Sequence, residues 1–83
     1  MKHARKDYDR IQDPAGLIPQ DEPVFLIRGQ DEVGPEVLRC WATLAELAGA
    51  DREIISKVMD HAEAMERWQI QHRRKIPDLP EGA

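Results

Sequence analysis

Residues 34–70 read GPEVLRCWATLAELAGADREIISKVMDHAEAMERWQI and carry the longest helical pattern in the chain. In both halves of this stretch, apolar residues recur at intervals of three and four, as they do along one side of an α-helix. In the first half they are Val37, Leu38, Trp41, Leu44, Leu47 and Ala48. Pro35 suits the first turn of a helix, and Gly49 suits the left-handed position just after one. The pattern predicts a helix over about residues 35–48.

The second half repeats the pattern with Ile54, Ile55, Val58, Met59, Ala62, Met65 and Trp68. Asp51 is a good N-cap, the basic run 73–75 complements a helix C-terminus, and Pro77 blocks continuation. We therefore expect a helix over about residues 51–75. The connection between the two helices is so short that it predicts an antiparallel hairpin. The second helix is the longer one, so its distal apolar residues need cover from the N-terminal segments or from another subunit.

The residues before the hairpin carry weaker signals. Tyr8 and Ile11 are three apart and would share one face of a short helix, about 3–12, which Asp13-Pro14-Ala15-Gly16 would end. Residues 24–27 are β-branched and aromatic enough for a strand, but the sequence offers no partner strand. We therefore expect a short helix over about 22–30, begun by Asp21, Glu22 and Pro23.

These elements predict an all-α protein with a short N-terminal helix and an antiparallel helical hairpin. A single domain would span residues 1–83, with the N-terminal helix and linker at 1–20, the hairpin region at 21–75 and a mobile tail at 76–83. A chain of 83 residues buries little surface. It has one cysteine, hence no internal disulfide, and we find no metal-ligand spacing among His3, His61 and His72. Homo-oligomerisation is the expected route to stability.

The formal net charge is −4 at pH 7. An acidic chain is a poor ligand for polymeric nucleic acid. The first ten residues nevertheless carry four basic groups against two acids, enough to hold a small anion. No apolar run approaches the length of a membrane span, no signal peptide is visible, and Cys40 suits a reducing compartment. We expect a soluble cytoplasmic protein that does not bind membranes.

The sequence offers little for catalysis. Cys40 lies in the middle of a predicted helix between Arg39 and Trp41, whereas reactive thiols favour helix N-termini or basic clefts. No Ser–His–Asp arrangement and no glycine-rich phosphate loop is apparent, and Asp31 and Glu32 are best interpreted as solvated acids. We expect no catalytic residue, no metal, no cofactor and no enzymatic activity.

Two polar or aromatic positions are candidates for ligand binding. Tyr8 lies among Arg5, Lys6 and Arg10, where a ring could stack on a base while cations meet phosphate; alternatively, Tyr8 docks its helix onto the hairpin. Arg28 follows an apolar run and needs an acid or an anion, so a nearby acid is the alternative to a ligand. Trp41 and Trp68 lie on the apolar stripes and belong to the core or to an oligomer interface.

Two segments resemble a known family when they are taken together: DYDRIQDP at residues 7–14 and DEPVFLIRGQD at residues 21–31. The later spacing of Val37, Arg39, Trp41, Ala62, Met65 and Trp68-Gln69 fits the same pattern. The chain resembles the phage-encoded nucleotide sponges that inhibit CBASS immunity, which share a helical hairpin with the sponges that inhibit Thoeris immunity. The resemblance covers about residues 5–70, and Gly29 stands where an alanine would be expected.

The resemblance implies a homohexamer that binds cyclic dinucleotides such as cyclic GMP–AMP, and in some members cyclic trinucleotides, between protomers. Such proteins sequester the messenger without cleaving it, in the cytoplasm of the bacterial host. Tyr8 would stack on a base, and Gln12 is our candidate for a base edge or ribose. The family's phosphate-binding lysine, expected near Pro23, has no match, so Lys6 and Arg28 are the candidates for that role.

A second interpretation comes from a different class of protein. The chain could be a helical protein-interaction module, or a phage accessory protein without a nucleotide ligand. Its hairpin would then dock another helical protein through Trp68 and its neighbours.

Overall fold

The computed structural model describes residues 2–3 and 13–79. Its elements are β1 (Lys2–His3), β2 (Pro23–Val24), α1 (Gly34–Leu47) and α2 (Arg52–Gln71). The contacts within the chain group into two compact units, Met1–Leu26 with Asp78–Ala83, and Ile27–Pro77. The prediction of a single domain stays a prediction. Neither of the two described helices is long and apolar enough to cross a membrane.

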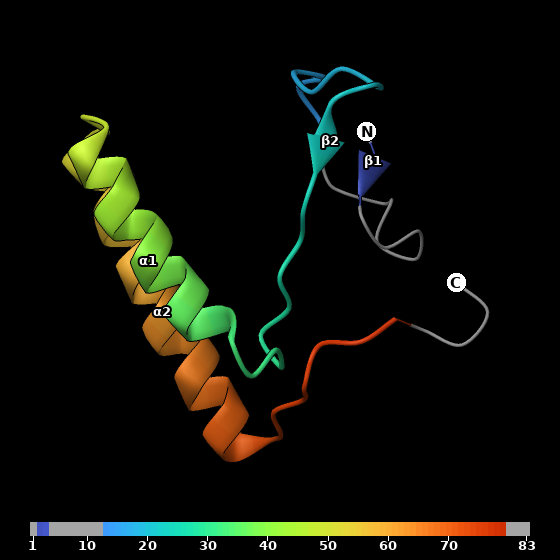
Figure 1. The fold of residues 1–83 in the computed structure, drawn as a ribbon, viewed down its shortest axis with the longest axis vertical. Helices are drawn as coiled ribbons and strands as arrows, with labels where there is room; N and C mark the ends of the chain where they lie inside the picture. Colours follow the sequence, from blue (N-terminus) through green and yellow to red (C-terminus); the bar gives the residue numbers. More distant parts are fainter. Residues whose placement is uncertain (1, 4–12, 80–83) are drawn as a thin grey trace. The chain divides into compact units, whose positions relative to one another are not determined.

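Helices α1 and α2 pack side by side as an antiparallel hairpin, which confirms the central prediction (Figure 1). Pro35 lies in the first turn of α1, as expected. Gly49 follows the helix with a φ of 87°, and the amide of Ala50 donates to the carbonyl of Ala45 at 2.9 Å. This is a Schellman ending, which requires the left-handed conformation that glycine adopts without strain. Asp51 then caps α2 by accepting from the amide of Glu53 at 3.1 Å.

The inner face of the hairpin is lined by small and medium side chains spaced three and four apart. They are Pro35, Leu38, Ala42 and Ala45 of α1, and Ile55, Val58, Ala62, Met65 and Gln69 of α2. Of the apolar side chains described, Pro35, Ala42, Ala62 and Met65 are buried, and no large side chain is fully buried. Small residues let the two helices approach closely, but they remove little apolar surface from water. The hairpin therefore has a thin core.

Helix α2 ends at Gln71, four residues before the predicted end. His72 leaves the helix with φ −123° and ψ −81°. The amide of Lys75 donates to the carbonyl of Gln30 at 2.7 Å, and the carbonyl of Lys75 accepts from the amide of Glu32 at 2.9 Å. The prediction was wrong because these tertiary hydrogen bonds compete with continued helix for the same backbone groups.

The short helix predicted over 22–30 is also wrong. Residues Pro23–Val24 form β2, which pairs in parallel with β1, with Lys2 opposite Pro23 and His3 opposite Val24. The partner strand comes from the start of the chain, where we expected a helix over 3–12. His3 lies in β1, and residues 4–12 lie outside the described part of the chain, as do residues 80–83 of the predicted tail. The all-α prediction therefore holds for the hairpin but not for this short pairing.

The turn predicted around Gly16 is present. The carboxylate of Asp13 accepts from the amides of Leu17 and Ile18 at 3.1 and 3.0 Å, and Gly16 has a φ of 64°. Aspartate commonly closes a turn in this way by bonding to backbone amides just ahead of it. The acid at position 13 thus organises the chain that follows it.

Candidate functional site

The segment that leads into α1 makes a turn at residues 28–31, in which the amide of Asp31 donates to the carbonyl of Arg28 at 3.0 Å. Gln69, near the end of α2, holds this turn in place. Its Nε2 group donates to the carbonyl of Gly29 at 2.9 Å and to that of Asp31 at 2.8 Å. A side-chain amide has two N–H donors, so one group satisfies two carbonyls of the turn.

Gln30 fastens the chain that leaves α2 to the same turn. It is only 8% exposed, and it is the buried polar residue of the described chain. Its Oε1 accepts from Arg73 Nε at 3.1 Å, while its carbonyl accepts from the amide of Lys75. The described residues contain no buried side-chain nitrogen or oxygen without a hydrogen-bond partner. The turn at 28–31 and the segment 72–77 thus form one hydrogen-bonded structure at the base of the hairpin.

The start of α1 completes this base. Asp31 Oδ1 accepts from the amide of Val33, and its carbonyl accepts from the amide of Gly34, both at 3.0 Å. Gly34 is tightly enclosed: a Cβ added there would lie 3.2 Å from Ile27 Cγ2 and 3.4 Å from Met65 Sδ. Glycine at this position lets Ile27 pack against the two helices.

Four basic residues belong to these bonded segments, namely Arg28, Arg73, Arg74 and Lys75; we call them the basic cluster. All four residues are exposed, at the base of the hairpin. Asp31 and Glu32 lie in the same segments and partly offset the charge. Sequence reasoning assigned residues 73–75 to a helix end and missed the hydrogen bonds of Arg73 and Lys75 to Gln30, in the turn that begins at Arg28. The run of three basic residues just before Pro77 was the available signal.

A shallow hollow of about 300 Å³ adjoins the cluster. It is lined by Glu66, Gln69, Ile70 and Arg74. Its volume is at the lower end of the range for small-ligand pockets. Glu66 also forms a salt bridge with Arg39 of α1, and this hydrogen bond is the main reason why the pKa of Arg39 is raised. The hollow is therefore lined by one cation, Arg74, one acid, Glu66, and one large apolar side chain, Ile70.

The predicted site residues are only partly placed. Arg28 lies on the turn at residues 28–31. Tyr8, Lys6 and Gln12 lie outside the described residues, so their roles in the site stay predictions. Cys40 is exposed on α1 and does not belong to the basic cluster. Within residues 2–3 and 13–79, no group of three or more histidines, cysteines or acids could hold a metal ion.

Comparison of the chain with protein-family models, with curated proteins and with solved structures finds no match.

Proposed function

We propose that this protein is a non-catalytic sponge for cyclic oligonucleotide messengers, including cyclic dinucleotides such as cyclic GMP–AMP and cyclic trinucleotides. By holding the messenger intact, it would keep CBASS effectors of the bacterial host inactive. The observation that carries the proposal is the basic cluster at the base of the hairpin, with Arg28 on a turn in which Gln69 holds the carbonyls of Gly29 and Asp31. The resemblance described above supplies the ligand class.

Charge supports a small anionic ligand. Each phosphodiester of a cyclic dinucleotide carries one negative charge, and a guanidinium group matches phosphate oxygens in shape and charge. Arg28, Arg73 and Arg74 supply three guanidinium groups in the segments of the base. The whole chain is acidic at −4, which disfavours a long polyanion but leaves a local cationic site available to a compact one.

Rigidity supports tight binding. A site whose backbone is already ordered loses less conformational entropy when a ligand arrives. The carbonyls of Gly29, Gln30 and Asp31 are all held by hydrogen bonds from α2 or the segment after it. Side chains on this turn therefore start from a restricted position.

The remaining ligand contacts are proposed from the sequence. Tyr8 would stack on a base, Lys6 would join Arg28 at phosphate, and Gln12 would bind a base edge or ribose. A sponge acts by mass action, so its dissociation constant must be around nanomolar, or roughly −12 kcal/mol. A homohexamer with sites between protomers would reach this by desolvating both faces of the ligand.

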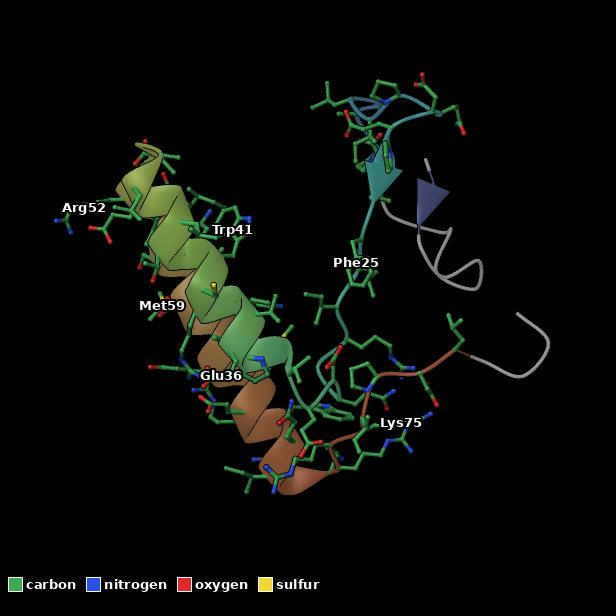
Figure 2. The ribbon with its side chains drawn as sticks, viewed as in Figure 1. Phe25, Glu36, Trp41, Arg52, Met59 and Lys75 are labelled. Carbon is green, nitrogen blue, oxygen red and sulfur yellow. The ribbon has the colours of Figure 1, made fainter. Side chains whose placement is uncertain are left out.

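Calorimetry with a panel of cyclic di- and trinucleotides tests the proposal. We expect nanomolar binding of at least one cyclic dinucleotide, recovery of the ligand unchanged after denaturation, and a loss of at least about tenfold in affinity for Arg28→Ala. Arg52→Ala is the matched control, because Arg52 begins α2 at the end of the hairpin away from Lys75 (Figure 2). Absence of binding across the panel, or cleavage of the ligand, would refute the sponge.

A helical protein-interaction module without a nucleotide ligand is the second candidate. The exposure of Trp41 and Trp68, at 47% and 39%, favours it, because large aromatic side chains are typical of protein interfaces. Binding of no cyclic nucleotide, together with a stable complex with another helical protein, would support this function instead.

A further inference from the structure

We infer that the hollow beside the basic cluster is a binding site for a guanine base. The protein would then prefer cyclic dinucleotides that contain guanine to those that contain only adenine. This inference rests on the proposed function and adds to it the class of base that is recognised. It is based on the polar atoms that line the hollow, which belong to Glu66, Gln69 and Arg74, and on the apolar side chain of Ile70.

Gln69 offers a hydrogen-bond acceptor to the hollow. Its Nε2 group has two N–H donors, and these are occupied by the carbonyls of Gly29 and Asp31. The reversed amide would place an oxygen against two carbonyl oxygens, so the turn fixes which way the amide faces. The Oε1 atom of Gln69 has no hydrogen-bond partner among the residues that the structure describes. The atom left for a ligand is therefore an oxygen.

Glu66 offers a second acceptor. One of its carboxylate oxygens, Oε1, accepts from Arg39 Nη2 in the salt bridge to α1. The other oxygen, Oε2, has no partner in the described part of the chain, and the side chain is 47% exposed. The salt bridge therefore restrains the carboxylate and leaves one of its oxygens available to a ligand that donates N–H groups.

These acceptors disfavour a phosphate in the hollow itself. A phosphate group is negatively charged and has acceptor oxygens, so it would be repelled by the carboxylate of Glu66 and would receive no donor from Gln69. A cationic ligand fits poorly as well, because Arg74 lines the hollow and has no hydrogen bond or ion pair within residues 2–3 and 13–79. The hollow suits a neutral group with N–H donors beside an acceptor.

The base-pairing edge of guanine has this arrangement of groups. Its N1–H and N2 amino groups donate, and the neighbouring O6 accepts. The two donors would meet Glu66 and Gln69, and O6 would meet Arg74, since a guanidinium group matches the O6 and N7 acceptors of guanine. Adenine has an acceptor at N1 and an amino group at position 6. It would therefore place a lone pair against Glu66 and an amino group against Arg74.

Ile70 supplies a surface for the flat face of the base. Its side chain is 85% exposed, so a ring that covers it removes apolar surface from water. Glu66 and Ile70 are four apart in α2 and share one side of the helix, while Arg74 follows the helix end. A volume of about 300 Å³ suits one base rather than a whole dinucleotide. The phosphates would stay outside the hollow, with the other members of the basic cluster.

Calorimetry of the native chain with three ligands tests the inference. Cyclic di-GMP and cyclic di-AMP carry the same two phosphates and differ only in their bases, and cyclic di-IMP has the edge of guanine without the N2 amino group. We expect cyclic di-GMP to bind at least about tenfold more tightly than cyclic di-AMP, with cyclic di-IMP between them, because an unmatched polar group in the site weakens binding.

The outcomes separate this inference from the proposed function. Equal or tighter binding of cyclic di-AMP would overturn the guanine site and leave the sponge intact. Binding of none of the three ligands would also overturn the guanine site, and absence of binding across the wider panel of cyclic nucleotides would refute the sponge as well.

Glu66→Gln tests the role of the carboxylate. The amide keeps the shape of the side chain but loses the charge, so we expect weaker binding of cyclic di-GMP and a preference over cyclic di-AMP of less than about threefold. Glu63→Gln is the matched control, because it removes the same charge from α2, breaks the ion pair with Arg67 and does not alter the lining of the hollow. A Glu66→Gln variant that keeps the native preference, or an equal loss of preference in Glu63→Gln, would overturn the inference.

Discussion

Gln69 and Gly29 are 40 residues apart in the sequence, yet Gln69 Nε2 donates to the carbonyl of Gly29 at 2.9 Å. The same nitrogen donates to the carbonyl of Asp31 at 2.8 Å. One side chain therefore joins the end of α2 to two carbonyls of the turn that carries Arg28. Arg73 and Lys75 add two further bonds to Gln30 in the middle of that turn. The stability of the base and the position of the basic cluster depend on the same contacts.

Gln69→Glu should destabilise the hairpin. The carboxylate keeps the shape of the side chain but has no N–H donor, so two carbonyls lose their partner and face a negative charge. We expect a loss of about 1–3 kcal/mol in the free energy of unfolding, measured by urea denaturation. Gln71→Glu is the control, because Gln71 is exposed at the end of α2. Equal effects of the two substitutions would contradict a stabilising role for the hydrogen bonds from Gln69 to Gly29 and Asp31.

Gly34→Ala and Gly29→Ala should act in opposite directions. At Gly34 the new Cβ would lie 3.2 Å from Ile27 Cγ2, so the packing must give way, at a cost of about 1–3 kcal/mol. At Gly29 no atom lies within 4 Å and φ is not positive, so alanine should be neutral or stabilise by up to about 1 kcal/mol. Thermal unfolding of the two variants measures the difference. A destabilised Gly29→Ala variant would show that the turn is more constrained than its contacts indicate.

Asp51→Ala should remove the cap of α2. The carboxylate accepts from the amide of Glu53 at 3.1 Å, and that amide has no partner within the helix. We expect a loss of about 1 kcal/mol in the free energy of unfolding by chemical denaturation. Asp51→Asn keeps an acceptor and should restore most of the stability. If the two substitutions are equally destabilising, the charge near the helix N-terminus, rather than the hydrogen bond, is the main contribution.

Arg73→Ala and Arg74→Ala should separate structure from binding. Arg73 Nε donates to the buried Gln30, whereas Arg74 lines the hollow beside the cluster. Arg74→Ala should weaken cyclic dinucleotide binding while leaving the unfolding temperature unchanged, and Arg73→Ala should lower both. Calorimetry at rising salt checks the electrostatic part, since exposed cations lose attraction as the ionic strength increases. Binding that is insensitive to salt would remove the basic cluster from the ligand site.

The Arg39–Glu66 pair should not make stability depend on pH near neutrality. The hydrogen bond to Glu66 raises the pKa of Arg39 above its already high ordinary value, so the guanidinium is charged in the folded and unfolded states up to strongly alkaline pH. A raised pKa contributes stability that is complete below the unfolded value and disappears only as the pH rises through the folded one. Unfolding curves of native protein and Arg39→Ala should therefore keep a constant separation between pH 7 and 9. A separation that changes over this range would point to another titrating group.

The sequence by itself determined the hairpin, because the relevant signals are local. Helical periodicity, Pro35 in a first turn, Gly49 after one helix and Asp51 before the next each act within a few residues. The predicted helix over about 35–48 differs from the observed Gly34–Leu47 by one residue at each end. The turn at residues 13–16 is also local, because the carboxylate of Asp13 bonds to the amides of Leu17 and Ile18, a few residues later.

Only the tertiary structure decided where α2 ends, which conformation residues 22–31 adopt and where the basic residues meet. Lys75 leaves the helix because its backbone pairs with Gln30 and Glu32, more than 40 residues earlier. Pro23 and Val24 are extended because Lys2 and His3 supply a partner strand. Each outcome depends on which distant group satisfies a backbone amide or carbonyl, and periodicity or propensity in one stretch of sequence holds no information about that partner.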